Sequence, residues 1–407
     1  MRVLMLSWEY PPHVVGGLGR HVMNLAPALA AEGVTVHVLT PLVRHGAQHE
    51  ITPDGVHVHR VAVPHMEDYG FLAFVREVNA ALERAASELQ RQVGDFALIH
   101  THDWLVASAA IALKHAWRRP LIGTIHATER GRQQGYVGNS HSEQINHMEW
   151  LLTYEAWRVI TCSRFMAAQV GEYFATPADN VDVVPNGIHV HHNPFASDDE
   201  RVAYRRRFVA DDQPLVFYVG RLVYEKGLHV LLDAWPHVLA ELPRARLLIA
   251  GTGGMLGALK QRAWDMGIAQ QVIFAGFVAD EDRDRLYRVA DVAAFPSIYE
   301  PFGIVALEAM SARCPVVVSE TGGLQEVVTI YETGLTVHPN DSASLAWGIL
   351  HTLQHPELSE RRAGSALREV CESYSWARVA SLTADVYRRT HDAWRQNPWG
   401  ATLAARQ

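Results

Sequence analysis

Cysteine is scarce in this sequence. Only Cys162, Cys314 and Cys371 occur in 407 residues, and they are widely separated. Two of the three lie in or beside apolar segments. This distribution argues against a disulfide framework and against a cysteine-based zinc site, so we expect a cytoplasmic protein.

Long apolar runs are also missing. No stretch approaches the length that a membrane-spanning helix needs, so we expect no membrane insertion. The apolar residues Val3 to Leu6 are followed at once by Ser7 and the polar-flanked segment Trp8-Glu9-Tyr10. Such a segment is too short for a secretory signal and predicts the first buried strand instead.

Positive charge does not predominate. The 36 lysine and arginine residues face 44 aspartate and glutamate residues, a formal balance of −8, which argues against a nucleic-acid partner. Hydrophobic residues make up 48% and charged residues 20%, as in ordinary globular proteins. A chain of 407 residues is long for one core, so we expect two domains.

Histidine is plentiful, with 23 residues. The group His189, His191 and His192 has no carboxylate or cysteine at ligand spacing, and its polar surroundings favour solvated side chains. The sequence therefore indicates no metal site and no cofactor.

Apolar strands alternate with helices in both halves of the chain. This pattern predicts an α/β protein with parallel sheets that helices cover on both faces. The expected strands span residues 34–40, 56–63, 96–100, 121–125, 159–162, 215–219, 246–250, 272–275 and 291–295.

The most informative stretch runs from Phe295 to Val328. Residues 297–301 are turn formers, and a periodic apolar segment begins after Gly303. Glu300 is therefore expected in a loop and Glu308 inside the following helix, roughly 7–8 Å along its axis from Gly303.

A helix that starts at a glycine after a parallel strand offers free N–H groups to a phosphate. Carboxylates on either side could accept hydrogen bonds from sugar and ribose hydroxyls. The simpler alternative makes Glu300 a helix cap and Glu308 a solvated residue. The scarcity of other charges around Glu308 favours the nucleotide-sugar site.

The stretch resembles the E-x7-E signature of retaining glycosyltransferases of family 4, which include glycogen synthase-like and sucrose-phosphate synthase-like enzymes. The resemblance implies a GT-B fold, in which two Rossmann-like domains face a central cleft. It implies an acceptor domain over residues 1–190, a donor domain over 191–374, and a C-terminal helix in 375–407 that crosses back to the first domain. It also implies that Phe302, Gly303 and Ile304 contact the donor.

A second motif surrounds Arg221 and Lys226. Both cations lie in a turn bounded by Gly220 and Gly227 after a buried strand, where they could converge on a diphosphate. The alternative is two exposed surface cations. The segment G-R-L-x-x-x-K-G resembles the diphosphate-binding pair of the family, which favours the first interpretation.

Glycine turns at neighbouring strand ends could admit a nucleobase. We expect its walls at Gly253, Phe277 and Val278.

The first strand leads into a glycine loop. The pattern from Ser7 through Glu9 to the glycines at 16, 17 and 19 resembles the donor-side loop of glycogen synthase-like enzymes. The resemblance implies donor contacts from Gly16, Gly17 and Leu18, and an acceptor-side place for Glu9. Many bacterial glycogen synthases carry lysine just before the glycine pair, where this chain has Val14 and Val15, so donor or acceptor preference could differ.

Two later strand ends carry further candidates. Asp103 could cap the next helix, or it could line the acceptor site together with Trp104, as the family's H-D-W segment implies. A lone histidine after a strand is more often structural, but the T-I-H resemblance implies that His126 faces the donor sugar. Arg130 and Arg132 begin an expected polar loop up to residue 142 and could reach the acceptor.

Together the resemblance implies transfer of a glucosyl unit from ADP- or UDP-glucose to an α-glucan, with His126, Arg221, Lys226 and Glu300 as catalytic residues. The alternative of a sucrose-phosphate synthase-like enzyme predicts a cationic acceptor pocket at Arg130 and Arg132. The glucan alternative predicts aromatic platforms, for which the candidates are Trp104, Tyr136 and Trp150.

Two further classes fit less well. A binding protein without catalysis does not explain the four charged candidates. A nicotinamide-dependent oxidoreductase would need the G-x-G-x-x-G spacing, which the first loop lacks.

Overall fold

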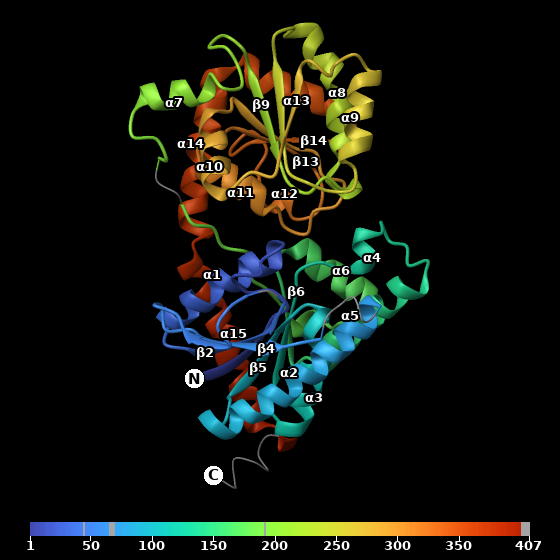
Figure 1. Ribbon diagram of the computed structural model, residues 1–407, viewed down its shortest axis with the longest axis vertical. Helices are drawn as coiled ribbons and strands as arrows, with labels where there is room; N and C mark the ends of the chain where they lie inside the picture. The colour runs from blue at the N-terminus through green and yellow to red at the C-terminus, as the bar shows by residue number, and fades with distance from the viewer. Residues whose placement is uncertain (44, 65–69, 191–192, 400–407) are drawn as a thin grey trace. The chain divides into compact units, whose positions relative to one another are not determined.

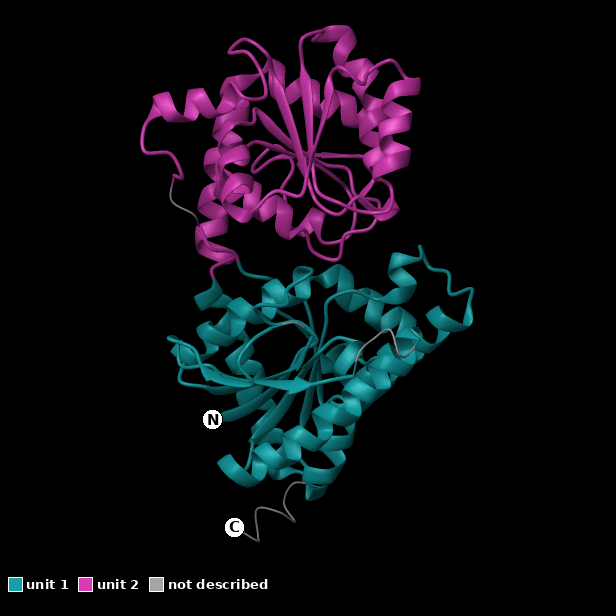
Figure 2. Ribbon diagram, viewed as in Figure 1, with its two compact units in different colours: residues 1–187, 376–407 teal, residues 188–375 magenta. Residues whose placement is uncertain are grey.

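The computed structural model describes residues 1–43, 45–64, 70–190 and 193–399. Of the histidines considered above, His191 and His192 lie outside these ranges. The chain forms two compact units (Figure 2): Met1–Gly187 joins with the chain from Trp376 onward as unit 1, and Ile188–Ser375 forms unit 2. The sequence analysis expected the divisions after residues 190 and 374.

Unit 1 is built on an eight-stranded sheet in the order β3-β4-β2-β1-β5-β6-β7-β8. Its strands are β1 (Arg2–Leu6), β2 (Thr35–Leu42), β3 (His49–Ile51), β4 (His57–Ala62), β5 (Leu98–His102), β6 (Leu121–Ile125), β7 (Arg158–Thr161) and β8 (Val181–Val183). Its helices are α1 (Gly17–Ala31), α2 (Phe71–Val93), α3 (Ala107–Trp117), α4 (Glu129–Arg132), α5 (Ser140–Glu155), α6 (Arg164–Phe174) and α15 (Trp376–Gln396), with short 3-10 turns at Trp104–Val106 and Ala178–Asn180.

The sheet is parallel except where β3 pairs antiparallel with β4. That edge strand was not expected, because three residues carry too little pattern to be recognised in a sequence. Strands β5 and β6 are buried along their whole length, as two-sided helical cover requires. The predicted α/β class with parallel sheets is confirmed.

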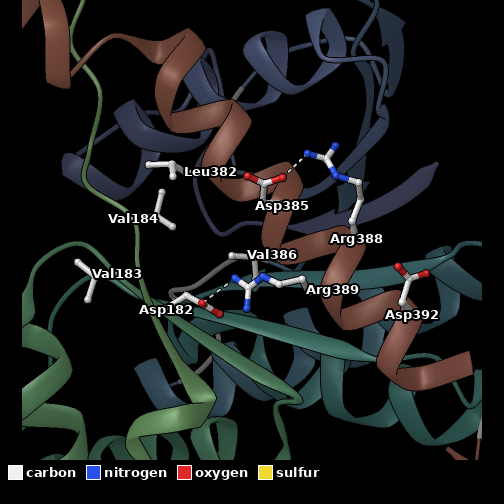
Figure 3. A pocket seen from close by; sticks show the side chains of 9 residues that line it. All are labelled: Asp182, Val183, Val184, Leu382, Asp385, Val386, Arg388, Arg389 and Asp392. Carbon is white, nitrogen blue, oxygen red and sulfur yellow. Dashed lines mark hydrogen bonds and ion pairs between the residues drawn. The ribbon is translucent and has the colours of Figure 1, made fainter. Parts of the chain in front are cut away.

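Helix α15 belongs to unit 1, although its sequence follows unit 2. Val379 and Tyr387 share one apolar core with Val3 and Leu25. A pocket of about 470 Å³ lies beside this helix, and Arg389 of α15 pairs there with Asp182 of β8 at 2.8 Å. Figure 3 shows the side chains that line it. None of its lining residues is a predicted site residue.

Unit 2 carries a six-stranded, all-parallel sheet in the order β11-β10-β9-β12-β13-β14 (Figure 1). Its strands are β9 (Leu215–Val219), β10 (Arg246–Ala250), β11 (Val272–Gly276), β12 (Val292–Phe295), β13 (Val316–Ser319) and β14 (Leu335–Val337). Its helices are α7 (Asp198–Arg205), α8 (Leu228–Glu241), α9 (Leu256–Asp265), α10 (Asp280–Val289), α11 (Ile304–Ser311), α12 (Leu324–Val327), α13 (Ser342–Gln354) and α14 (Pro356–Ser373), with a 3-10 turn at Tyr224–Lys226. Within the described ranges, no helix has the combination of length and apolar character that crossing a membrane requires.

One expectation about a polar segment was wrong. The expected loop from Glu129 to Ser142 contains α4 and the start of α5, because Thr128 caps the first helix and Asn139 caps the second.

Candidate active site

Glycines bring the strand ends of unit 2 close together. In the turn after β9, the N–H of Gly220 donates to the carbonyl of Ala250 at the end of β10, at 3.1 Å. Gly227 closes the turn with φ of +67°, and a Cβ there would lie 1.9 Å from the carbonyl oxygen of Pro296. Only glycine fits that position, so the turn that carries Arg221 and Lys226 is fixed against the end of β12.

The loop that carries Glu300 is held from two sides. The N–H of Ile298 donates to the carbonyl of Glu225 at 2.8 Å. From the other side, the hydroxyl of Thr321 donates to the carbonyl of Ile298 at 2.9 Å. The N–H of Gly323 donates to the carbonyl of Glu300, also at 2.9 Å. The loop therefore bridges the two turns that the sequence analysis singled out.

Lys226 and Glu300 meet directly. The ammonium Nζ lies 2.6 Å from Oε2 of Glu300, and the two side chains are only 18% and 10% exposed. The hydroxyl of Ser297 donates to the same carboxylate oxygen at 3.3 Å. Two predicted site residues thus form one ion pair. A ligand could separate the pair by placing a negative charge against Lys226 and hydroxyl groups against Glu300.

Arg221 stands apart from this pair. Its side chain is 61% exposed, and Nη2 lies 3.3 Å from Oε1 of Glu225 in the same turn. That Arg221 and Lys226 bind one anion together remains a prediction. The exposed guanidinium of Arg221 is free to turn toward such an anion.

Glu308 lies within α11, and its carboxylate is buried. Nη1 of Arg283 on α10 lies 3.1 Å from Oε1, and the hydroxyl of Tyr287 donates to Oε2 at 3.4 Å. Burial and the Glu308 charge raise the pKa of Tyr287 well above its usual range, so its hydroxyl stays a donor. The sequence analysis missed Arg283 and Tyr287, because their spacing on one helix face does not reveal a partner on another helix.

The start of α11 is shaped by Gly303, which has φ of +109°. A Cβ on Gly303 would lie 2.6 Å from Cδ2 of Leu324, so the helix begins in close contact with α12. Phe302 is buried before it, and Ile304 is half-buried as the first helical residue.

The expected nucleobase walls lie at two other strand ends. Gly253 has φ of +158°, and a Cβ there would lie 2.3 Å from the carbonyl oxygen of Leu222. Phe277 follows β11 with 80% of its surface exposed, and Val278 is half-buried. An aromatic ring this open can stack on a flat ligand.

In unit 1 the glycine loop already binds a carboxylate. The N–H groups of Val15 and Gly16 donate to Oε2 of Glu9 at 2.7 and 3.0 Å. A Cβ on Gly19 would lie 2.5 Å from that oxygen, which explains the glycine there. A donor phosphate at these two amides would have to displace Glu9. Gly17 and Leu18 lie in the first turn of α1.

Asp103 does not cap the helix that follows it, because its side chain makes no capping bond. Its Oδ1 instead accepts from the N–H of His126 at 2.7 Å, and burial raises the pKa of Asp103 to about 7. The cap alternative is therefore wrong. Trp104 is only 7% exposed and packs edge-on against Phe71, so it is no open aromatic platform.

His126 is half-buried, and its ring lies among other histidines of unit 1. Its Nε2 lies 3.1 Å from Nδ1 of His102, and its ring centroid lies 4.8 Å from that of His21. Burial lowers the pKa of His126 to about 4 and of His21 to about 3, and it places that of His102 well below its usual range. The sequence analysis missed His21 and His102 as site residues, since nothing in their spacing links them to His126.

The two arginines of α4 already have partners. Nη1 of Arg132 lies 3.5 Å from Oε2 of Glu129, and Arg130 lies over the ring of Tyr173 at 4.5 Å. Both carboxylate oxygens of Glu149 accept from the N–H of Glu129, and burial raises the pKa of Glu149 to about 8. The surroundings of α4 are therefore acidic as well as basic.

Comparison with known proteins matches both halves of the chain. The profile described as Glycosyl transferases group 1 matches residues 201–368, and that of Glycosyltransferase Family 4 matches residues 15–192. The chain is 38% identical over 400 residues to a glycogen synthase of Mycobacterium tuberculosis, covering 95% of this chain and 94% of that protein.

The chain is a family 4 glycosyltransferase.

Other relatives agree. An uncharacterized glycosyltransferase of Methanocaldococcus jannaschii is 39% identical over 397 residues, covering 95% of this chain and 98% of that protein. A sucrose-phosphate synthase from Thermosynechococcus elongatus has a similar structure, with a TM-score of 0.81 at 24% identity over 96% of this chain and 99% of that one. This family 4 glycosyltransferase therefore has the GT-B fold and is an enzyme of the hexosyltransferase type.

The contact between Gly227 and Pro296 gives a prediction for this glycosyltransferase. In Gly227→Ala, the new methyl group would collide with a carbonyl oxygen at a positive φ, so we expect the free energy of unfolding to fall by about 1–3 kcal/mol. Urea unfolding of the two proteins measures this difference.

Gly254→Ala is the matched control, because a Cβ at that position meets no atom within 4 Å. We expect its unfolding free energy to stay close to that of the wild type. Equal stability of the two variants would contradict the close approach of the turn to the end of β12.

Proposed function

We propose that this chain transfers a glucosyl unit, with retention of configuration, from ADP-glucose or UDP-glucose to an α-glucan. The observation that carries the proposal is the Lys226–Glu300 pair, 2.6 Å apart in unit 2 beside the start of α11. It combines a cation for a diphosphate with a carboxylate for sugar hydroxyls within the reach of one nucleotide-sugar molecule.

The remaining donor contacts follow from the same turns. Glu308, oriented by Arg283, would accept hydrogen bonds from the ribose hydroxyls. The N–H groups at the start of α11 and the guanidinium of Arg221 would bind the diphosphate, and Phe277 would stack on the base. The starch synthase IV of Arabidopsis thaliana, bound to ADP and acarbose, has a similar fold with a TM-score of 0.75 at 18% identity.

During transfer the bond from the anomeric carbon to the diphosphate oxygen breaks, and negative charge grows on the diphosphate. Lys226, Arg221 and the N-terminus of α11 would stabilise that charge. The acceptor hydroxyl attacks the same face of the sugar, and its proton passes to the departing phosphate oxygen. No carboxylate nucleophile is assigned, and His126 is proposed to donate a hydrogen bond to a donor hydroxyl.

The glucan acceptor is proposed from the 38% identity to glycogen synthase over nearly the whole of both chains. Unit 1 gives little support to the alternative of a sugar-phosphate acceptor, because Arg132 pairs with Glu129 and Arg130 lies against Tyr173. On the glucan side, Trp104 is buried, whereas Tyr136 and Trp150 are 71% and 37% exposed. These two are the aromatic platforms that remain.

The assay for this proposal is release of nucleoside diphosphate from ADP-glucose and from UDP-glucose. Each donor is incubated with glycogen, with fructose 6-phosphate, with a panel of other hexose phosphates, and without acceptor. We expect release that depends on glycogen and a longer α-1,4-glucan as product, measured by incorporation of labelled glucose.

If nucleoside diphosphate is released only when a hexose phosphate is present, the acceptor is a small phosphorylated sugar and not a glucan. Release with no acceptor dependence at all would contradict both versions of the proposal.

Glu300 and Glu308 are predicted to divide their roles. In Glu300→Gln we expect turnover to fall about 10- to 150-fold, the equivalent of the roughly 1.5–3 kcal/mol of a hydrogen bond to a charged group, with nearly unchanged affinity for the nucleoside diphosphate. In Glu308→Gln the affinity for the diphosphate should fall instead. Steady-state kinetics and calorimetric titration separate the two effects.

Glu281→Gln serves as the control, because its side chain is 77% exposed and pairs only across the surface of α10. It should behave as wild type in both measurements. Equal losses of nucleotide affinity in Glu300→Gln and Glu308→Gln would contradict the division of roles.

A further inference from the structure

Three histidines of unit 1 come together from three separate elements. His21 lies on α1, His102 ends β5, and His126 follows β6. One ring nitrogen of each lies within 4.8 Å of those of the other two. Such a group cannot be recognised from sequence, because 81 residues separate His21 from His102.

The spacing is close to that of a metal site. Zinc bound by imidazole has Zn–N distances of about 2.0–2.1 Å, so two ligand nitrogens at a tetrahedral ion lie about 3.3 Å apart. Nδ1 of His102 and Nε2 of His126 are already 3.1 Å apart. The third nitrogen lies within 4.8 Å of these two, so it would need to move by at most about 1.5 Å to reach this spacing.

The ring of His21 is oriented as a ligand. Its Nδ1 donates to Oδ1 of Asn186 at 2.7 Å, and both side chains are buried. This bond fixes the proton on Nδ1 and leaves the lone pair on Nε2, which is how metal-binding histidines are positioned by their neighbours. The backbone of His126 is held in turn by Asp103, which accepts from its N–H at 2.7 Å.

The ring of His102 is incompletely satisfied. Its Nδ1 faces Nε2 of His126 at 3.1 Å, so without an ion one of these two nitrogens must donate a proton to the other. Its other ring nitrogen, Nε2, is buried and has no hydrogen-bond partner among the described residues. The protein alone therefore leaves the nitrogens of this cluster incompletely satisfied, which is costly for buried polar groups.

We propose that His21, His102 and His126 form a binding site for one divalent transition-metal ion of the zinc type. Three imidazoles suit Zn²⁺ or Co²⁺, whereas Mg²⁺ and Ca²⁺ prefer oxygen ligands. Imidazole binds such ions through the lone pair of an unprotonated ring nitrogen. His126 is half-buried and provides the approach, and a water molecule would complete the tetrahedron.

The proposal has a consequence for catalysis that rests on the proposed function. If His126 donates a hydrogen bond to the donor sugar, an ion bound to its ring competes with that contact. Zn²⁺ is then an inhibitor of transfer rather than a cofactor.

The test uses the full-length chain without a histidine tag, treated with a chelator and dialysed. Co²⁺ is added while visible absorption is recorded, because tetrahedral Co²⁺ absorbs far more strongly than the hydrated ion. Zn²⁺ binding is then measured by calorimetry, and the melting temperature is recorded with and without Zn²⁺. We expect one strong site per chain, the tetrahedral Co²⁺ spectrum, and a higher melting temperature with Zn²⁺.

His21→Gln and His126→Gln each remove one ligand and should weaken the strong site at least about tenfold. His57→Gln is the matched control, because His57 stacks on His37 at the sheet edge, outside the three-histidine group. Two ligand variants are used so that a folding defect in one does not decide the result.

Equal Zn²⁺ affinity in all four proteins, or the absence of a tetrahedral Co²⁺ spectrum in the wild type, would overturn the proposal. The catalytic consequence is tested separately by nucleoside diphosphate release with added Zn²⁺. Strong binding without inhibition would leave the metal site standing and would contradict the role of His126 in the proposed function.

Discussion

A lysine and a glutamate that are 74 residues apart in sequence meet at 2.6 Å in unit 2, and the surrounding backbone is arranged to permit this contact. The turn of Lys226 can approach the end of β12 only because position 227 is glycine. The loop of Glu300 is fixed by hydrogen bonds from Ile298 and Gly323. Because the pair is largely buried, its electrostatic interaction is stronger than that of a surface ion pair, and a charged ligand can exploit it.

Unit 1 follows a different physical principle. Its polar centre carries little charge, because burial lowers the pKa values of His21, His102 and His126 and raises that of Asp103 to about 7. Such a region offers hydrogen bonds without strong charge, as a neutral sugar requires. The same neutral imidazoles are also the form that binds a metal ion, which links the proposed transfer to the proposed inhibitory site.

The sequence predicted the parts of the fold that depend on local patterns. Strands β6, β9 and β10 and the position of Glu308 inside a helix followed from apolar periodicity and glycine placement. Contacts between distant elements did not. Nothing in the sequence joins Arg283 to Glu308, or His21 to His126. The hydrogen bonds from the glycine loop to the carboxylate of Glu9 were not foreseen either, because sequence spacing does not show which side chain folds back onto a loop.

The most direct test of the donor site is calorimetric titration of ADP and UDP into the wild type, Lys226→Met and Lys260→Met. Lys260 is the control, since it is an exposed residue of α9 in the same unit. The account predicts that Lys226→Met loses about 10- to 150-fold in affinity, as expected for a charge-assisted hydrogen bond worth roughly 1.5–3 kcal/mol, while Lys260→Met binds as the wild type does. Unchanged affinity in a folded Lys226→Met protein would contradict the assignment of Lys226 to the donor diphosphate.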